Sequence, residues 1–163
     1  MKNQSVLVVV AHPDDEVLGC GGSIAKHNAR GDTVSVLFMS DGVKSRDLTL
    51  VDKAVDLRRK SAESACHLLG VSKTIFLNHP DNQLDQVPML QLIKGIESVL
   101  KELRPTIIYT HHSSDLNIDH ICTHNAVVTA CRPQPSCLVQ RLLFFEIPSS
   151  TEWRPASSRS SFV

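Results

Sequence analysis

The residues best suited to chemistry lie near the start of the chain, directly after the apolar run of residues 6–10. Histidine and carboxylate side chains crowd the segment that follows, Ala11-His12-Pro13-Asp14-Asp15-Glu16. One imidazole and several carboxylates at this spacing suit a divalent metal ion and leave a carboxylate for proton transfer. A catalytic metal site of this kind takes three protein ligands and keeps one position open, so His12 and Asp15 are candidates for two of them.

A second cluster, between residues 111 and 120, can supply the third ligand. It follows a predicted strand and reads His111-His112-Ser113-Ser114-Asp115-Leu116-Asn117-Ile118-Asp119-His120. His120 is the best candidate, because it falls at a predicted helix start and therefore on a rigid element. Asp119 beside it is placed to hold a ligand histidine by a hydrogen bond.

Strands and helices are predicted to alternate along the chain and to position these clusters. Short, apolar, β-branched runs predict strands at about 5–11, 33–39, 73–77, 106–110 and 138–146. Helices are predicted at about 18–30, 49–69, 89–103 and 120–130. This alternation predicts an α/β fold, a Rossmann-like three-layer sandwich with a mostly parallel sheet and helices on both faces. We expect a single domain over residues 1–153 and a mobile polar tail over residues 154–163.

Right-handed crossovers bring the loops after the strands to one edge of such a sheet, where ligands bind. Asp41 and Asp81 lie in two of these loops and are candidates for contacts with a substrate, although a solvated turn position is an equal alternative. Either Arg58 or Arg59 is a further substrate-binding candidate, with a solvated helix face as the alternative.

Composition excludes several classes of function. Lysine plus arginine equals aspartate plus glutamate, at 17 each, so the zero net charge argues against nucleic acid as a partner. We expect neither a membrane span nor a secretory signal, because no apolar stretch approaches the ~20 residues that a membrane helix needs and the first apolar run is short. The five cysteines are odd in number and lack CxxC spacing, which favours reduced thiols and a cytoplasmic location.

Together the two clusters resemble the motifs of the PIG-L/LmbE-like zinc-dependent N-deacetylases. The first motif, His12-Pro13-Asp14-Asp15-Glu16 followed by Leu18-Gly19-Cys20-Gly21-Gly22, is similar to that family's opening motif. The second, Asp115-Leu116-Asn117-Ile118-Asp119-His120, is similar to its later motif. The closing segment 145–153 resembles one found in bacterial sugar-deacetylase members, so the resemblance covers about residues 5–153.

The resemblance implies one Zn²⁺ per chain, with His12, Asp15 and His120 as its ligands and Asp14 as the general base. Other divalent transition metals also suit these ligand types. The reaction it implies is removal of the acetyl group from an N-acetylated sugar of the N-acetylglucosamine type. Water attacks the amide carbonyl, and Asp14 takes the proton of that water and passes it to the leaving amine.

Asn117 stands where the family often has a histidine that stabilises the oxyanion. Its amide can donate a hydrogen bond but not a proton, so His111 or His112 is an alternative donor. Asp115 in the same motif is a candidate for binding the substrate. The expected partner is a small N-acetyl sugar or sugar conjugate, with neither nucleic acid nor membrane, and the resemblance is compatible with a homo-oligomer. The sequence leaves open a free sugar, a glycoside, a nucleotide sugar or a chitooligosaccharide.

Two alternatives compete with this interpretation. The chain ends ten residues after Trp153, which together with Asn117 suggests a catalytically inactive, C-terminally shortened paralogue that binds metal or sugar without turnover. A nicotinamide enzyme is the other alternative, because Gly19-x-Gly21 resembles part of a dinucleotide fingerprint. That match is poor, since Ile24 occupies the third glycine position and the glycines come seven residues after the expected strand end.

Overall fold

The computed structural model describes residues 3–42, 51–135, 137–148 and 150. The predicted tail 154–163 lies outside these residues, as does most of the segment 149–153. Within them, strands and helices alternate in the order β1 (Ser5–Val10), α1 (Asp15–Ala29), β2 (Thr33–Ser40), α2 (Val51–Leu68), β3 (Lys73–His79), the short 3₁₀ helix η2 (Leu84–Gln86), α3 (Met89–Leu103), β4 (Ile107–His111), α4 (Ile118–Ala130) and β5 (Arg141–Phe145).

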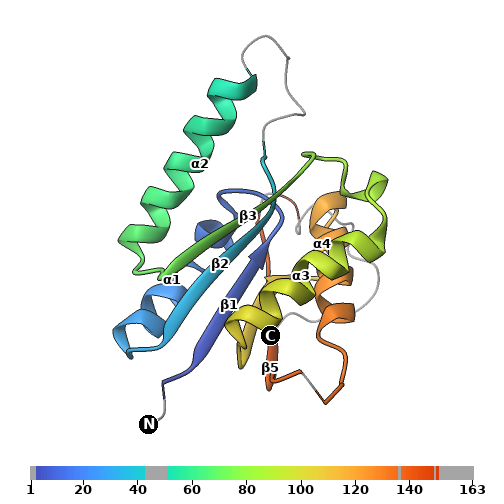
Figure 1. The fold of residues 1–163 in the computed structure, drawn as a ribbon. Helices are drawn as coiled ribbons and strands as arrows, with labels where there is room; N and C mark the ends of the chain where they lie inside the picture. Colours follow the sequence, from blue (N-terminus) through green and yellow to red (C-terminus); the bar gives the residue numbers. More distant parts are fainter. Residues whose placement is uncertain (1–2, 43–50, 136, 149, 151–163) are drawn as a thin grey trace.

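The five strands form one parallel sheet in the order β3-β2-β1-β4-β5. Helices α1 and α2 cover one face of this sheet, and α3 and α4 cover the other (Figure 1). The predicted α/β sandwich is therefore confirmed. Alternate residues of β1 belong to different cores: Leu7 and Val9 pack with α3 and α4, whereas Val8 and Val10 pack with α1 and α2. Burial on both faces explains why this strand is a continuous apolar run.

Helix α1 begins three residues earlier than the sequence predicts. The carboxylate of Asp15 accepts a hydrogen bond from the backbone N–H of His12 at 2.9 Å, and Glu16 accepts one from the N–H of Asp14 at 3.0 Å. These bonds draw both acids into the first helical turn, where they also complement the helix dipole. The helix therefore starts within the first motif, at Asp15.

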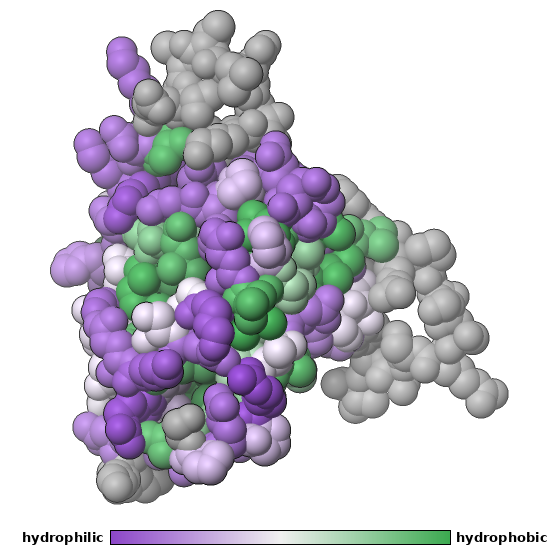
Figure 2. Space-filling view, turned by 45° about the vertical axis from the view of Figure 1, so that its right-hand side comes forward, coloured by the Kyte–Doolittle hydropathy of each residue, from purple (hydrophilic) through white to green (hydrophobic). Residues whose placement is uncertain are grey.

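The surface is mixed in character. On the face shown in Figure 2, hydrophilic side chains predominate and small apolar patches lie between them. Among the described residues, every helix is too short or too polar to cross a bilayer.

Candidate metal centre

Four loops meet where the strands end, at the junction of β1 and β4. The chain leaves β1 through His12, β3 through Asp81, β4 through the second motif, and β5 through Ile147 and Ser150. In the order β3-β2-β1-β4-β5, the chain runs outward in opposite directions from β1 and β4. Such a switch point opens a crevice at the carboxyl edge of a parallel sheet. The two motifs meet in this crevice, where His12 and His120 come together although they are 108 residues apart in the sequence.

Three potential ligand atoms form a nearly equilateral triangle there. The distance from His12 Nδ1 to Asp15 Oδ2 is 3.3 Å, from His120 Nε2 to Asp15 Oδ2 is 3.3 Å, and from His120 Nε2 to His12 Nδ1 is 3.3 Å. The centre of such a triangle lies about 1.9 Å from each corner, which suits an ion that binds nitrogen and oxygen at about 2.0–2.2 Å. All three residues are buried. The structure thus brings together the three residues predicted to be metal ligands.

The other nitrogen of each histidine is held by a carboxylate. His12 Nε2 lies 3.1 Å from Asp119 Oδ2 and 3.3 Å from Asp81 Oδ1. His120 Nδ1 lies 3.0 Å from Asp115 Oδ2. Such partners fix the orientation of a ligand ring and raise its basicity.

These carboxylates are themselves fixed by the surrounding loops. Asp119 is fully buried and accepts hydrogen bonds from the backbone N–H groups of Asn82 and Leu84, at 2.8 and 3.0 Å. Ser150 donates its hydroxyl to Asp115 at 2.9 Å. The loops after β3 and β5 therefore support the histidines that follow β1 and β4.

Charge in this cluster favours a bound cation. Burial opposes protonation of His12, but hydrogen bonds to Asp119 and Asp15 raise its pKa to about 10. Burial likewise opposes protonation of His120, but Asp115 and Asp15 raise its pKa to about 9. Burial would raise the pKa of Asp15, yet the surrounding imidazoles hold that pKa well below its usual range. The buried carboxylates therefore require positive charge at the triangle, and a divalent ion can supply it by displacing the two protons.

Asp14 lies beside the triangle in an unusual backbone conformation. Its φ of 149° and ψ of −26° are values that a residue with a side chain rarely adopts, and such strain is frequent at functional sites. Its Oδ2 lies 2.6 Å from Nη2 of Arg58, whose Nε–H donates to the carbonyl of Pro13 at 3.2 Å. Burial raises the pKa of Asp14, and the negative charge of Asp15 adds to that rise. A carboxylate with a raised pKa is suited to taking up and releasing a proton.

Asn117 caps α4. Its side-chain oxygen accepts hydrogen bonds from the backbone N–H of Asp119 at 2.9 Å and of His120 at 3.4 Å. The same residue lines the pocket above the triangle. Because the oxygen is used by the helix cap, the NH₂ group remains to donate a hydrogen bond.

The pocket over the triangle has a volume of about 320 Å³. Its polar wall includes Asp14, Arg58, Asp81, Asn82 and Asn117, and its apolar wall is made by Leu18, Leu116 and Ile147.

The structure places five candidate residues whose positions the sequence left open. Arg58, rather than Arg59, lines the pocket, while Arg59 stacks on the ring of Phe76. Asp81 lines the pocket too. Asp115 faces His120 and is only 2% exposed, and Asp41 is buried after β2 and is not among the lining residues.

The sequence-based interpretation did not identify two features of this site. Ser150 follows β5 without a motif of its own, although it fell within the segment of family resemblance. His111 was considered only as an alternative hydrogen-bond donor, but its ring is fully buried beneath the pocket. The sequence feature that could have indicated His111 is its position at the end of a strand, where the loops with the predicted ligands begin.

The glycines that resembled a dinucleotide fingerprint lie inside helix α1. A Cβ on Gly19 would come within 2.2 Å of the ring of Phe145. This glycine therefore allows α1 to pack closely on the end of β5. It does not form the strand-to-helix turn of a dinucleotide site.

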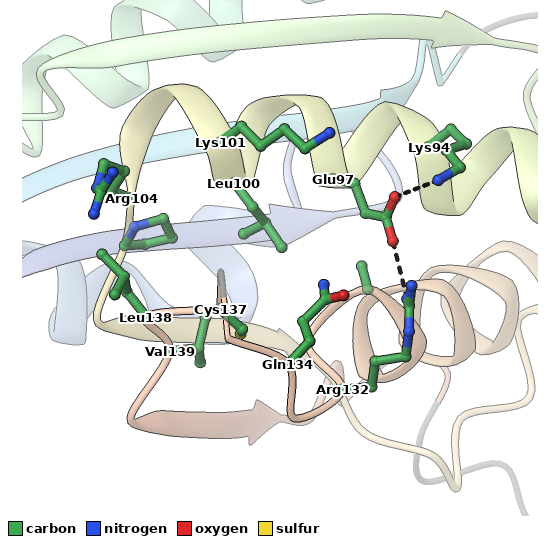
Figure 3. A pocket seen from close by; sticks show the side chains of 12 residues that line it. Lys94, Glu97, Leu100, Lys101, Arg104, Arg132, Gln134, Cys137, Leu138 and Val139 are labelled. Carbon is green, nitrogen blue, oxygen red and sulfur yellow. Dashed lines mark hydrogen bonds and ion pairs between the residues drawn. The ribbon is translucent and has the colours of Figure 1, made fainter.

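A second pocket, of about 250 Å³, lies at the opposite edge of the sheet, between the ends of α3 and α4 and the start of β5 (Figure 3). Its rim carries the basic side chains of Lys94, Lys101, Arg104 and Arg132. Glu97 lies between two of them, at 2.8 Å from Lys94 Nζ and 2.9 Å from Arg132 Nη1 (Figure 3).

Comparison with known proteins supplies independent evidence. The model of the PIG-L family, described as GlcNAc-PI de-N-acetylase, matches residues 7–131. A relative from Escherichia coli (strain K12), named uncharacterized deacetylase YaiS, is 30% identical over 154 residues, covering 91% of this chain and 77% of the relative.

Two solved structures are similar in fold and sequence. The conserved protein TT1542 from Thermus thermophilus is 29% identical, with a TM-score of 0.74 over 88% of this chain and 66% of that one. The N,N'-diacetylchitobiose deacetylase from Pyrococcus horikoshii, solved with an inhibitor, is 28% identical, with a TM-score of 0.69 over 77% of this chain and 48% of that one. The present chain thus spans two thirds or less of either solved protein.

Proposed function

This chain belongs to the PIG-L family, and from that premise we propose that it is a metal-dependent hydrolase that removes the acetyl group from N-acetylated sugars. The relatives named as deacetylases support the general reaction. The observation that carries the proposal is the buried triangle of His12, Asp15 and His120 with Asp14 beside it. Histidine and carboxylate ligands with one open position are typical of catalytic zinc sites, so Zn²⁺ is the proposed ion.

His12, Asp15 and His120 would hold the zinc ion, which when bound would supply Lewis acidity toward the attacking water and the carbonyl of the acetyl group. Asp14 takes a proton from the attacking water as its oxygen bonds to the carbonyl carbon. The same carboxyl then gives this proton to the amide nitrogen as the C–N bond breaks. This releases acetic acid and the amine of the sugar, and Asp14 returns to its ionised form. The acid then gives its remaining proton to the amine, so the final products are acetate and the ammonium form of the sugar.

Two further side chains assist the reaction. Arg58 holds the Asp14 carboxylate through the ion pair at 2.6 Å and so sets its direction. The NH₂ group of Asn117 donates a hydrogen bond to the oxyanion that develops on the carbonyl oxygen. Asn117 cannot act as an acid, so Asp14 serves as both base and acid in this mechanism.

The proposed substrate is a sugar of the N-acetylglucosamine type. Asp81 and Asn82 offer oxygen and nitrogen atoms to its hydroxyl groups from the polar wall of the pocket. Free thiols at all five cysteines support a cytoplasmic location, where thiols stay reduced.

Release of acetate and of primary amine from N-acetylglucosamine and diacetylchitobiose tests the function, with the zinc-loaded chain and its Asp14→Asn variant side by side. The proposal expects release by the wild type and its loss in the variant, with zinc retained by both. Zinc binding without release from either sugar would instead support the alternative of a metal-binding domain without turnover.

A further inference from the structure

His111 is fully buried at the end of β4. Its ring contacts Asp15, His120 and the backbone of Ala11, the residue directly before His12. Its Nε2 lies 2.9 Å from the backbone nitrogen of Ala11 and 3.4 Å from Asp15 Oδ2. The ring also stacks on that of His120, with centroids 3.9 Å apart and an angle of 14° between the planes. It does not line the pocket, so it is not placed to contact a substrate.

The contact with Ala11 extends the pairing of β1 with β4 by a side chain. The registered partners of these strands end at Val8 and Tyr109. Beyond them, the backbone N–H of Ala11 donates to the imidazole of His111 instead of to a carbonyl. The ring thereby fixes the backbone at the residue directly before His12.

A third aromatic ring, that of Phe145, packs against His111 and so supports its contact with His120. The ring of Phe145, which belongs to β5, lies 4.9 Å from the ring of His111. Gly19 of α1 has no side chain, which leaves room for the ring of Phe145. The three rings of Phe145, His111 and His120 therefore form a continuous packed series. A change in the middle ring would release the ligand ring at its end.

We propose that His111 is a positioning residue, which sets the spacing of the His12, Asp15 and His120 ligand atoms without binding the metal itself. It acts on His12 through the Ala11 N–H and on His120 through the stack, and its ring packs against the Asp15 carboxylate at 3.4 Å. This inference rests on the proposed metal centre and adds to it a residue that the motif resemblance assigned no such role.

Two substitutions separate the two kinds of contact. His111→Phe keeps an aromatic ring for the stack but removes the acceptor for Ala11. His111→Gln keeps an acceptor at a similar reach but removes the ring. His27→Phe is the matched control, because His27 is also a buried histidine, paired with Asp32 and Tyr109 away from the metal centre.

The zinc dissociation constant would be measured by competition with a chromophoric chelator, together with the visible spectrum of the cobalt(II) form and the melting temperature of the metal-free chain. We expect both His111 variants to bind zinc roughly 10- to 100-fold more weakly and to shift the cobalt spectrum. His27→Phe should lower the melting temperature and leave the zinc constant and the spectrum unchanged.

Wild-type zinc affinity and an unchanged cobalt spectrum in both His111 variants would overturn the inference while leaving the metal centre intact. Unfolding of both metal-free variants would also overturn it, since His111 would then be a residue of the core alone. Absence of zinc binding by the folded wild type would instead overturn the proposed function.

Discussion

At the carboxyl edge of the sheet four buried carboxylates surround two histidines, whereas at the opposite edge the basic side chains of the pocket are exposed and Glu97 between them is buried. In the metal centre, Asp15, Asp81, Asp115 and Asp119 are each at most 3% exposed. In the basic pocket, the side chains of Lys94 and Arg132 are 63% and 48% exposed. The volumes of the two pockets are similar, at about 320 and 250 Å³.

The difference shows that desolvated charge, and not pocket size, distinguishes the carboxyl edge with the candidate metal centre. Helices α3 and α4 both end at the basic pocket, and cations near helix C-termini are favoured by the helix dipole. Solvent and Glu97 compensate these cations. Four buried carboxylates around two histidines have no comparable solvent contact, so a bound cation is expected to stabilise them.

The strongest test of this contrast removes one ligand from the metal centre. His120→Ala should reduce zinc from about one ion per chain to nearly none, because two remaining ligands hold zinc weakly. Lys101→Ala, at the basic pocket, should leave the zinc content unchanged. Mass spectrometry of metal content on both purified chains measures this, and full zinc in His120→Ala would show that the triangle is not the metal site.

Within the candidate metal centre, the carboxylate proposed to bind metal can be separated from the one proposed to move a proton. Asp14→Asn should lower turnover by roughly 10²- to 10⁴-fold, because the amide cannot accept the proton of the attacking water. Zinc content should stay at the wild-type level, since Asp14 is not one of the three triangle ligands. Rates of amine release measured on zinc-loaded protein test this, and turnover equal to wild type would remove Asp14 from the mechanism.

At Asn117 a role in stability can be separated from a role in turnover, because this residue both caps α4 and lines the pocket. Asn117→Ser keeps a capping oxygen and removes the amide donor, so we expect roughly 10²-fold slower turnover with little change in melting temperature. Asn117→Ala should add a loss of about 1 kcal/mol in the free energy of unfolding, from the lost cap. Equal turnover in Asn117→Ser and wild type would assign Asn117 to the cap alone.

The smallest effect is expected at the basic pocket. Hydrogen bonds from Lys94 and Arg132 lower the pKa of Glu97, so its ionised form stabilises the fold above its ordinary pKa of 4.5, and this contribution is lost as the pH falls below that value. Glu97→Gln should therefore cost about 0.5 kcal/mol at pH 7, and this difference should shrink as the pH falls from 4.5 through the lowered pKa of Glu97 in the folded state. Urea unfolding at pH 7 and at a series of lower pH values measures this, and a difference of several kcal/mol would contradict the description of the basic side chains as compensated by solvent and Glu97.

Much of the fold was predictable because apolar runs and helical periodicity are local properties. The valine-rich residues 6–10 define a strand by themselves, and alternation with helices then predicts a parallel sheet. The start of α1 was predicted less well, because Asp15 and Glu16 enter the helix through bonds to neighbouring backbone N–H groups.

The candidate site was predictable to the extent that its residues occur in compact motifs. His12, Asp15 and His120 fall within two such motifs, and the crossover rule brings their loops together. The supporting contacts of His111 and Ser150 depend on which strands are neighbours and on how side chains pack. A single sequence carries no local pattern for either of those properties.

The placement of the proposed metal ligands on both sides of the β1–β4 junction also has a consequence for how the protein matures. His12 and His120 are 108 residues apart, so a growing chain carries two of the ligands long before the third is made. Only after α4 has been synthesised and β4 has paired with β1 can all three hold one ion. Metal capture is therefore expected late in folding, only after the chain has grown past α4 and the two strands have paired.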